Sequence, residues 1–262
     1  MPVDAFVPLP VHVNAVRQIV ETRSSAPFCK DRHRRNVESP PQQFSREEFW
    51  FRMVTCICTS VQGAGPDSRL AQFVREVPFS LRLDRCKSAT DLRSWAQRTL
   101  SEKGIRFGPT RGAWIEANLS RLDGGLWSIV EEYFFKLAQF PAGGSSEARV
   151  ALERNAARAI AGRPVGLNGA GAKQARNIWQ CMGVTQFEIP LDSRVCNWAN
   201  GLTPAFPIDA KKLYRSVPYY EEVMSRIQAL CQAAGKLPCD FDAAVFSSFD
   251  SSEWPEGDTV FG

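Results

Sequence analysis

The amino-acid sequence predicts an all-α protein, on three observations. Apolar residues recur at helical spacing in most segments from residue 45 onward, strand-type alternation is nearly absent, and prolines and glycines separate the helical segments. A length of 262 residues suits one large domain or two small ones. We divide the chain into an N-terminal helix and basic arm (residues 1–44), a main helical domain (45–250) and an acidic C-terminal tail (251–262).

The first 44 residues are expected to hold one helix. Residues 11–22 place four apolar side chains on one helical face, after two prolines. Residues 24–43 are polar, contain three prolines and include a basic run at 30–35. We interpret this stretch as a linker or loosely docked arm, either a solvated loop or a segment that touches phosphate.

The main domain begins with a capping box. Ser45, with Glu48 three residues later, opens an apolar helix that extends to about residue 61. Glycines and a proline at 63–66 end this helix, and a second helix follows through residues 70–73. Further helices are predicted over residues 122–140, 147–161 and 218–235.

The composition excludes several kinds of site. The two histidines, His12 and His33, both precede residue 40, so neither a Ser-His-Asp or Cys-His catalytic site nor a histidine-rich metal site is expected. The eight cysteines form no CxxC pair and no compact cluster, so neither structural zinc nor an iron–sulfur cluster is expected, and no cofactor is implied.

The same features indicate an intracellular protein with reduced thiols, in the cytoplasm or nucleoid, or in the nucleus of a eukaryote. The N-terminus does not resemble a signal peptide, and no apolar run approaches the length of a membrane span, so we expect no membrane association. Residues 250–262 carry four acids and no base, which leaves 32 basic against 24 acidic residues, or +8, on residues 1–249. A basic body favours a polyanionic partner.

One glycine-rich segment between two predicted helices carries chemistry. Gly169 and Gly171 flank Ala170 in a tight turn directly before an amphipathic helix. Such a turn exposes backbone N–H groups at a helix N-terminus, where a phosphate can bind. We therefore predict that Gly169, Ala170 and Gly171 contact the phosphate backbone of a polyanionic partner. The alternative is an ordinary αα-hairpin in which the glycines only reverse the chain.

A lysine and an aspartate follow this turn, nineteen positions apart in the sequence. Lys173 ends the motif LNGAGAK (residues 167–173), and Asp192 comes nineteen residues later within PLDSRV (residues 190–195), at the expected N-cap of another helix. This combination resembles the helix-hairpin-helix DNA glycosylases, and within them the 8-oxoguanine DNA glycosylase/abasic-site lyase branch. The iron–sulfur cysteines of the endonuclease III branch are missing.

Further segments resemble this family in the same order, over residues 45–250. They are TSVQ (59–62), GIRF and RGAWI (104–115) and AAVFS (243–247). Three positions depart from the family: Asn168 replaces the usual hairpin proline, Asn177 stands in place of a cysteine, and Asp242 stands in place of a glutamine. The last two changes leave the identity of the base open.

The resemblance implies a fold and a function. The fold would be two helical subdomains around a cleft, with a helix-hairpin-helix motif that binds double-stranded DNA. The protein would be a monomer that flips out and excises 8-oxoguanine in base excision repair, with Lys173 as Schiff-base nucleophile and Asp192 as the carboxylate at the sugar. The resemblance also implies a site for a monovalent cation among the hairpin carbonyl groups.

The base pocket would contain Phe246, Asp242, Asn177 and Gln62. Phe246 would stack on the extruded base, and Asp242, four residues earlier, shares its helical face. A carboxylate accepts two parallel hydrogen bonds, which N1–H and N2–H₂ of guanine offer, whereas N1 of adenine is an acceptor. The alternative is that Phe246 belongs to the core and Asp242 is an acid at a helix start.

Two other functions remain open from the sequence. The same fold can excise another damaged or hypermodified base, for instance in defence against modified phage DNA. A non-catalytic helix-hairpin-helix protein that only binds DNA is the other alternative, although binding phosphate requires neither Lys173 nor Asp192.

Overall fold

Helices account for most of the computed structural model, which describes residues 6–249 and Trp254 apart from residues 61, 64, 142, 163 and 164. Within these residues no strand is formed, and the only extended pairing is an isolated bridge between Ala161 and Leu167. The prediction of an all-α protein is therefore confirmed. None of the described helices is both long enough and apolar enough to cross a membrane.

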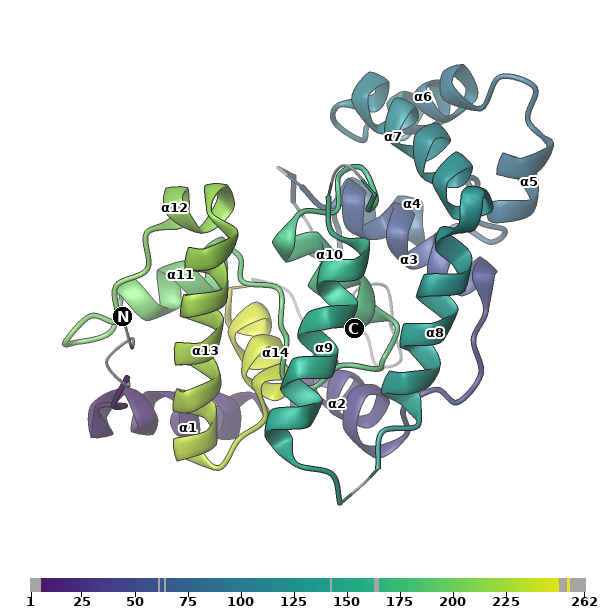
Figure 1. The fold of residues 1–262 in the computed structure, drawn as a ribbon. Helices are drawn as coiled ribbons and strands as arrows, with labels where there is room; N and C mark the ends of the chain where they lie inside the picture. The colour runs from purple at the N-terminus through teal and green to yellow at the C-terminus, as the bar shows by residue number, and fades with distance from the viewer. Residues whose placement is uncertain are drawn as a thin grey trace.

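The first two helices of the chain and its last helices form one group (Figure 1). α1 packs against α13 and α14, and α2 packs against α14, so residues far apart in sequence share one part of the core. This first group comprises α1 (Pro10–Arg23), α2 (Pro27–His33), η1 (Arg34–Glu38), α11 (Ser193–Asn200), α12 (Ala210–Arg215), α13 (Val217–Ala234) and α14 (Pro238–Ser248).

The expectation of a linker or loosely docked arm at residues 24–43 is wrong. This stretch contains α2 and the π-helical turn η1, and the basic run lies within them. Phe28, Arg32 and Asn36 are buried, and Asn36 Nδ2 donates to the carbonyls of Gln180 and Thr185. The local sequence does not show that Arg32, in this basic run, forms a buried ion pair with Asp242, which is 210 positions later in the chain.

The middle of the chain forms a second group of helices, with α9 and α10 beside the first group (Figure 1). Ion pairs between α9 and α13, such as Arg158 with Glu221, join the two groups. The second group comprises α3 (Arg46–Cys58), α4 (Arg69–Val74), α5 (Leu83–Ser88), α6 (Leu92–Glu102), α7 (Gly108–Arg121), η2 (Leu122–Leu126), α8 (Trp127–Ala138), α9 (Ser146–Ile160) and α10 (Ala172–Cys181).

Several predicted helix boundaries agree with the structure. Ser45 Oγ accepts from the Glu48 N–H at 3.2 Å and caps α3, as its position in the sequence predicts. The helix expected over residues 122–140 is divided, because Gly125 adopts a φ of 121° between η2 and α8. The short helices α5, α6 and α12 were not predicted.

α10 is at the centre of the core. Its Trp179 is fully buried, contacts Phe49 of α3 and donates its indole N–H to the Ala156 carbonyl of α9 at 2.9 Å. Satisfying the indole N–H in this way allows a large aromatic ring to be buried at little polar cost. α10 is therefore held between α3 and α9, which fixes the residues on its remaining face.

Candidate active site

One cavity of about 500 Å³ contains all the side chains predicted to carry catalysis or to hold the base. It lies where α10, the start of α11, α14, α2 and the segment after α3 come together. The predicted residues that line it are Lys173, Asp192, Phe246, Asp242, Asn177 and Gln62. The structure thus brings together residues spread over 185 positions of the sequence, from Gln62 to Phe246, counting both ends.

Lys173 is the second residue of α10 and is half-buried. α10 begins without a side-chain cap, so no side chain satisfies the N–H groups of its first turn. Within the described residues, Lys173 Nζ has neither a hydrogen-bond nor an ion-pair partner.

Asp192 is the N-cap of α11, as the sequence predicts. Its Oδ1 accepts from the N–H groups of Arg194 at 2.8 Å and Val195 at 3.3 Å, while Oδ2 lies 3.4 Å from the Arg194 guanidinium. These contacts hold the carboxylate in place at the cavity wall. The same side chain therefore caps a helix and presents negative charge to the cavity.

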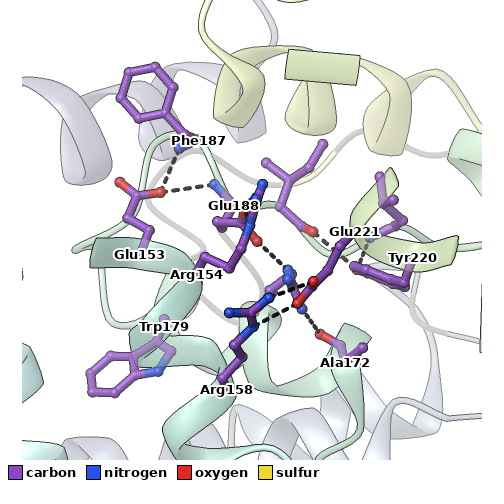
Figure 2. Close-up of polar contacts among 12 residues, drawn as sticks. Glu153, Arg154, Arg158, Ala172, Trp179, Phe187, Glu188, Tyr220 and Glu221 are labelled. Carbon is purple, nitrogen blue, oxygen red and sulfur yellow. Dashed lines mark hydrogen bonds and ion pairs between the residues drawn. The ribbon is translucent and has the colours of Figure 1, made fainter. Parts of the chain in front are cut away.

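A buried polar network positions the segment that leads into Asp192 (Figure 2). Glu188 pairs with Arg176 at 2.6 Å and with Arg154 at 2.9 Å, and Tyr220 Oη accepts from the Leu191 N–H at 2.7 Å. Arg176 lies three residues after Lys173 on α10. The Arg176–Glu188 pair therefore ties the lysine's helix to the aspartate's segment. Removing one member of such a buried pair costs about 3–5 kcal/mol.

Asp242 forms a buried ion pair that the sequence did not reveal. Its Oδ2 lies 3.0 Å from Arg32 Nη1, and both side chains are almost inaccessible to solvent. Burial raises the pKa of Asp242 to about 6, although the Arg32 guanidinium opposes this shift. Asp242 is therefore mostly ionised at neutral pH and accepts protons under mildly acidic conditions. It is not simply an acid at a helix start.

Phe246 is half-buried and already has neighbours on its ring. Phe28 stacks on it with centroids 4.7 Å apart and an angle of 15°, and the Arg194 guanidinium carbon lies 4.1 Å from its centroid. Trp254 lies tilted at 6.3 Å, the one residue of the predicted acidic tail within the described structure. A base that stacks on Phe246 must therefore fit beside Phe28 and displace or adjoin Arg194.

Gln62 and Asn177 form parts of the cavity wall. Gln62 Nε2 donates to the Cys58 carbonyl at 2.6 Å, and its Oε1 accepts from the Arg106 N–H, so its amide is held in place. Asn177 Nδ2 donates to Gln174 Oε1 at 3.3 Å. Asn177 reaches the cavity from α10, and Gln62 reaches it from the segment that follows α3.

Among the other residues that line this cavity, sequence reasoning gave no role to Arg32, Gln180 or Arg194. Arg194 is within the PLDSRV motif, and its contacts to Asp192 and Phe246 follow from local helix geometry. A buried carboxylate needs a paired cation, so a buried Asp242 implies a basic partner such as Arg32, although its position in the sequence does not identify that partner. Gln180 lies seven residues after Lys173, two turns along the same face of α10, and helical spacing alone could have found it.

The glycine-rich turn joins α9 to α10 through its own hydrogen bonds and contacts with α7. Gly169 has a φ of 80°, and a Cβ there would lie 2.6 Å from the Trp114 ring. Asn118 brackets Asn168 by donating to its carbonyl at 3.0 Å and accepting from its N–H at 2.7 Å. The family's usual proline would lack that N–H, so Asn168 has a partner here that proline could not use.

The three predicted phosphate contacts differ in how they are placed. Gly171 is exposed with open space around its α-carbon, and Gly169 is half-buried. Ala170 is fully buried, and its N–H donates to the Leu167 carbonyl at 3.2 Å. The geometry does not support Ala170 as a phosphate contact, because its only donor is used inside the turn. Gly171 and the first turn of α10 remain available.

The turn does not offer an open ring of oxygen ligands for a cation. The carbonyls of Leu167, Asn168 and Ala170 accept from protein N–H groups, and that of Gly166 accepts from the Arg121 guanidinium. The positive charge of Arg121 disfavours a second cation beside it. Elsewhere in the described part of the chain, no cluster of three or more histidine, cysteine or acidic residues has the arrangement of a metal site.

No family model, curated protein or solved structure matches the chain.

Proposed function

We propose that the protein is a bifunctional DNA glycosylase and abasic-site lyase that acts on oxidised guanine. The observation that carries this proposal is the convergence of Lys173 and Asp192 in one cavity with an aromatic ring, Phe246, and a buried carboxylate, Asp242. An amine and a carboxylate serve the sugar, and the ring and the second carboxylate serve the base. A protein that only binds DNA needs none of these four groups in a cavity.

The reaction needs a nucleophile and a negative charge near the sugar. The lone pair of neutral Lys173 Nζ attacks C1′ as the C1′–N bond breaks, and the departing base takes the bonding electrons and is protonated. Asp192 stabilises the positive charge that develops on the sugar. The aminal opens to a Schiff base, loss of a C2′ proton eliminates the 3′ phosphate, and water releases the lysine.

DNA would bind across the same face. We propose that α9, the turn and α10 form a helix-hairpin-helix motif, in which Gly171 and the open N–H groups of α10 hold a phosphate. The two groups of helices would act as subdomains on either side of the cleft, and the protein would bind duplex DNA as a monomer. Flipping the base costs a few kcal/mol, which stacking and hydrogen bonds in the cavity offset.

Borohydride trapping tests this proposal directly. The full chain is incubated with a duplex that contains one 8-oxoguanine, with an undamaged duplex as control, and borohydride is added to reduce any Schiff base. We expect a covalent protein–DNA adduct with the damaged duplex alone. No adduct with either 8-oxoguanine or a preformed abasic site would overturn the lyase assignment.

A related specificity follows from two residues. Asn177 and Asp242 line the cavity, and both depart from the residues that the resemblance implies there, so a second candidate is the same reaction on another damaged or hypermodified base. Excision measured on a panel of duplexes, each with one modified base, separates this candidate from the first.

The hairpin gives a prediction about binding rather than chemistry. Gly171→Asp places a carboxylate at the N-cap of α10, where aspartate is a favoured residue, so the melting temperature should be unchanged or higher. The same charge repels phosphate, so binding to undamaged duplexes of any sequence should weaken. Filter binding or fluorescence anisotropy over a series of salt concentrations measures this. Parent affinity that does not depend on salt, or equal binding by the variant, would remove the hairpin from the interface.

A bulky residue at Gly169 serves as the structural comparison. Its φ of 80° and its contact with Trp114 predict strain and displacement of the turn, so a larger residue should lower both stability and duplex binding. Loss of binding in Gly171→Asp without loss of stability then separates the phosphate contact from folding.

The pocket gives a prediction about base excision. Asp242→Ala would leave Arg32 buried and unpaired, so Asp242→Asn is the better variant because its carbonyl oxygen can still accept from Arg32. Asp242→Asn and Phe246→Ala should each cost about 1–3 kcal/mol of transition-state binding, through lost hydrogen bonds and lost stacking respectively. Single-turnover excision of 8-oxoguanine measures both.

Lyase action on a preformed abasic site is the control for these two variants. Neither change touches Lys173 or Asp192, so strand cleavage at an abasic site should persist, whereas a folding defect would lower both activities. Excision at the parent rate in both variants would mean that the base is held elsewhere, with Asn177 and Gln62 the next residues to change.

The raised pKa of Asp242 predicts a pH dependence of excision. Below its pKa of about 6 the carboxyl group is protonated and loses acceptor capacity, so excision should fall as the pH is lowered from 7 to 5. Lyase action on an abasic site shares Lys173 and Asp192 but not the base, so the ratio of the two rates isolates Asp242. The ratio should change with a midpoint near pH 6 in the parent and stay flat in Asp242→Asn. A flat ratio in the parent would contradict this role.

A further inference from the structure

The backbone that leads into Asp192 is held by one hydroxyl group. Tyr220 Oη accepts from the Leu191 N–H at 2.7 Å and donates to the Ile189 carbonyl at 3.2 Å (Figure 2). Within the described part of the chain, no other hydrogen bond reaches the backbone of these two residues or of the proline between them, which has no N–H to donate. The path of the chain into α11 therefore depends on this hydroxyl.

The hydroxyl of Tyr220 is suited to hold two backbone groups at once. The residue is on α13 and is almost fully buried. Burial raises the pKa of Tyr220 above its usual value, although the Arg176 guanidinium opposes this shift. The hydroxyl therefore keeps its proton, which it donates to one backbone group while its oxygen accepts from the other.

The ring of the same residue contacts the helix that carries Lys173. The guanidinium carbon of Arg176, on α10, lies 4.7 Å from the ring centroid of Tyr220. Tyr220 and Lys173 also line a second, smaller cavity of about 180 Å³. One side chain thus lies against both the helix of the lysine and the segment that ends at Asp192.

The capping contacts of Asp192 cannot replace this support. They join the carboxylate to Arg194 and Val195, which belong to the same segment and move with it. Without the Tyr220 hydroxyl, one N–H and one carbonyl would be left without their partner, and the backbone would shift to find others. A shift of about 1 Å in a group that acts on a transition state can cost roughly 100-fold in rate.

We propose, given the glycosylase function above, that Tyr220 is a positioning residue for base excision and that it acts through Asp192. By holding the backbone at residues 189–191, its hydroxyl sets the place of the Asp192 carboxylate relative to the Lys173 amine. Tyr220 takes no part in the bond-breaking steps itself.

Tyr220→Phe tests this role, because it removes the hydroxyl and keeps the ring that contacts Arg176. Single-turnover excision of 8-oxoguanine should fall about 10- to 100-fold, while the affinity for undamaged duplex should be unchanged. The melting temperature should fall, since two backbone groups lose their partner, so excision is measured below the melting temperature of the variant.

A double-mutant cycle with Asp192→Asn separates positioning from a general loss of structure. If Tyr220 acts through the carboxylate, Tyr220→Phe should cause no further loss of excision once that carboxylate is gone. A structural role would lower excision by the same factor in both backgrounds, and that result would overturn the inference.

Tyr219→Phe is the matched control. Tyr219 precedes Tyr220 on α13, and its hydroxyl accepts from the Asp209 N–H at 3.0 Å, in another segment. Tyr219 does not line the main cavity. Its replacement removes the same group from the same helix and should leave excision at the parent rate.

Hydrogen–deuterium exchange gives a second measurement that needs no enzyme activity. In Tyr220→Phe, exchange should be faster in a peptide that covers residues 187–195 and unchanged in a peptide from α3. Faster exchange throughout the protein, or a variant that no longer folds, would show that the hydroxyl is needed for the fold as a whole and would overturn the inference.

Failure of this inference can be told from failure of the proposed function. If the parent forms no adduct with an abasic site and excises no base, the proposed function fails and this inference with it. If the parent is active but Tyr220→Phe excises 8-oxoguanine at the parent rate, the function stands and Tyr220 does not position Asp192.

Discussion

Lys173→Gln should abolish both borohydride trapping and strand cleavage while leaving binding to duplex DNA nearly unchanged. The lysine side chain is at the positive end of α10 in the cavity, and no described side chain pairs with its ammonium group. Glutamine keeps a polar side chain of moderate length on the same helix but has no nucleophilic amine. Adduct formation on an 8-oxoguanine duplex, followed by gel electrophoresis, gives the measurement.

Lys211→Gln is the matched control for this experiment. Lys211 is likewise the second residue of a helix, α12, but it is exposed and does not line the cavity. Its replacement removes the same charge and should leave trapping at the parent level. Undiminished trapping in Lys173→Gln would assign the nucleophile to another residue, and loss of trapping in both variants would indicate a dependence on net charge.

The site residues that could be predicted from the sequence are those whose roles depend on spacing between nearby residues of the chain. Asp192 was predicted as an N-cap, and the structure confirms that role because capping depends on the next three residues only. Lys173 was placed at the start of a helix by the glycines before it. Helical period likewise put Asp242 and Phe246 on one face, and both line the cavity.

The site residues whose roles could not be predicted from the sequence depend on contacts between segments that are far apart in the chain. Arg32 and Asp242 are 210 positions apart, and nothing local indicates that one of several basic residues in the run is buried while the others are not. For Ala170, the tight turn was foreseen, but its N–H proved to be used within the turn.

The two roles of Asp192 make its replacement the sharpest test of the proposed chemistry. As a cap, its Oδ1 accepts from two N–H groups at the start of α11, and asparagine is about as good an N-cap as aspartate. Asp192→Asn should therefore cost at most ~1 kcal/mol of stability. As the charge beside C1′, it has no substitute, and base excision should fall roughly 10²–10³-fold, the loss typical when an electrostatic partner of a transition state is removed.

Asp91→Asn isolates the capping role from the charge. Asp91 is the N-cap of α6, accepts from the Ser94 N–H at 3.0 Å and does not line the cavity, so the same substitution there tests the cap alone. Thermal unfolding should respond similarly in the two variants, whereas excision should fall only in Asp192→Asn. Near-parent excision by Asp192→Asn would reduce Asp192 to a helix cap, and the positive charge on the sugar would then require another carboxylate, with Asp242 the other acid that lines the cavity in the described structure.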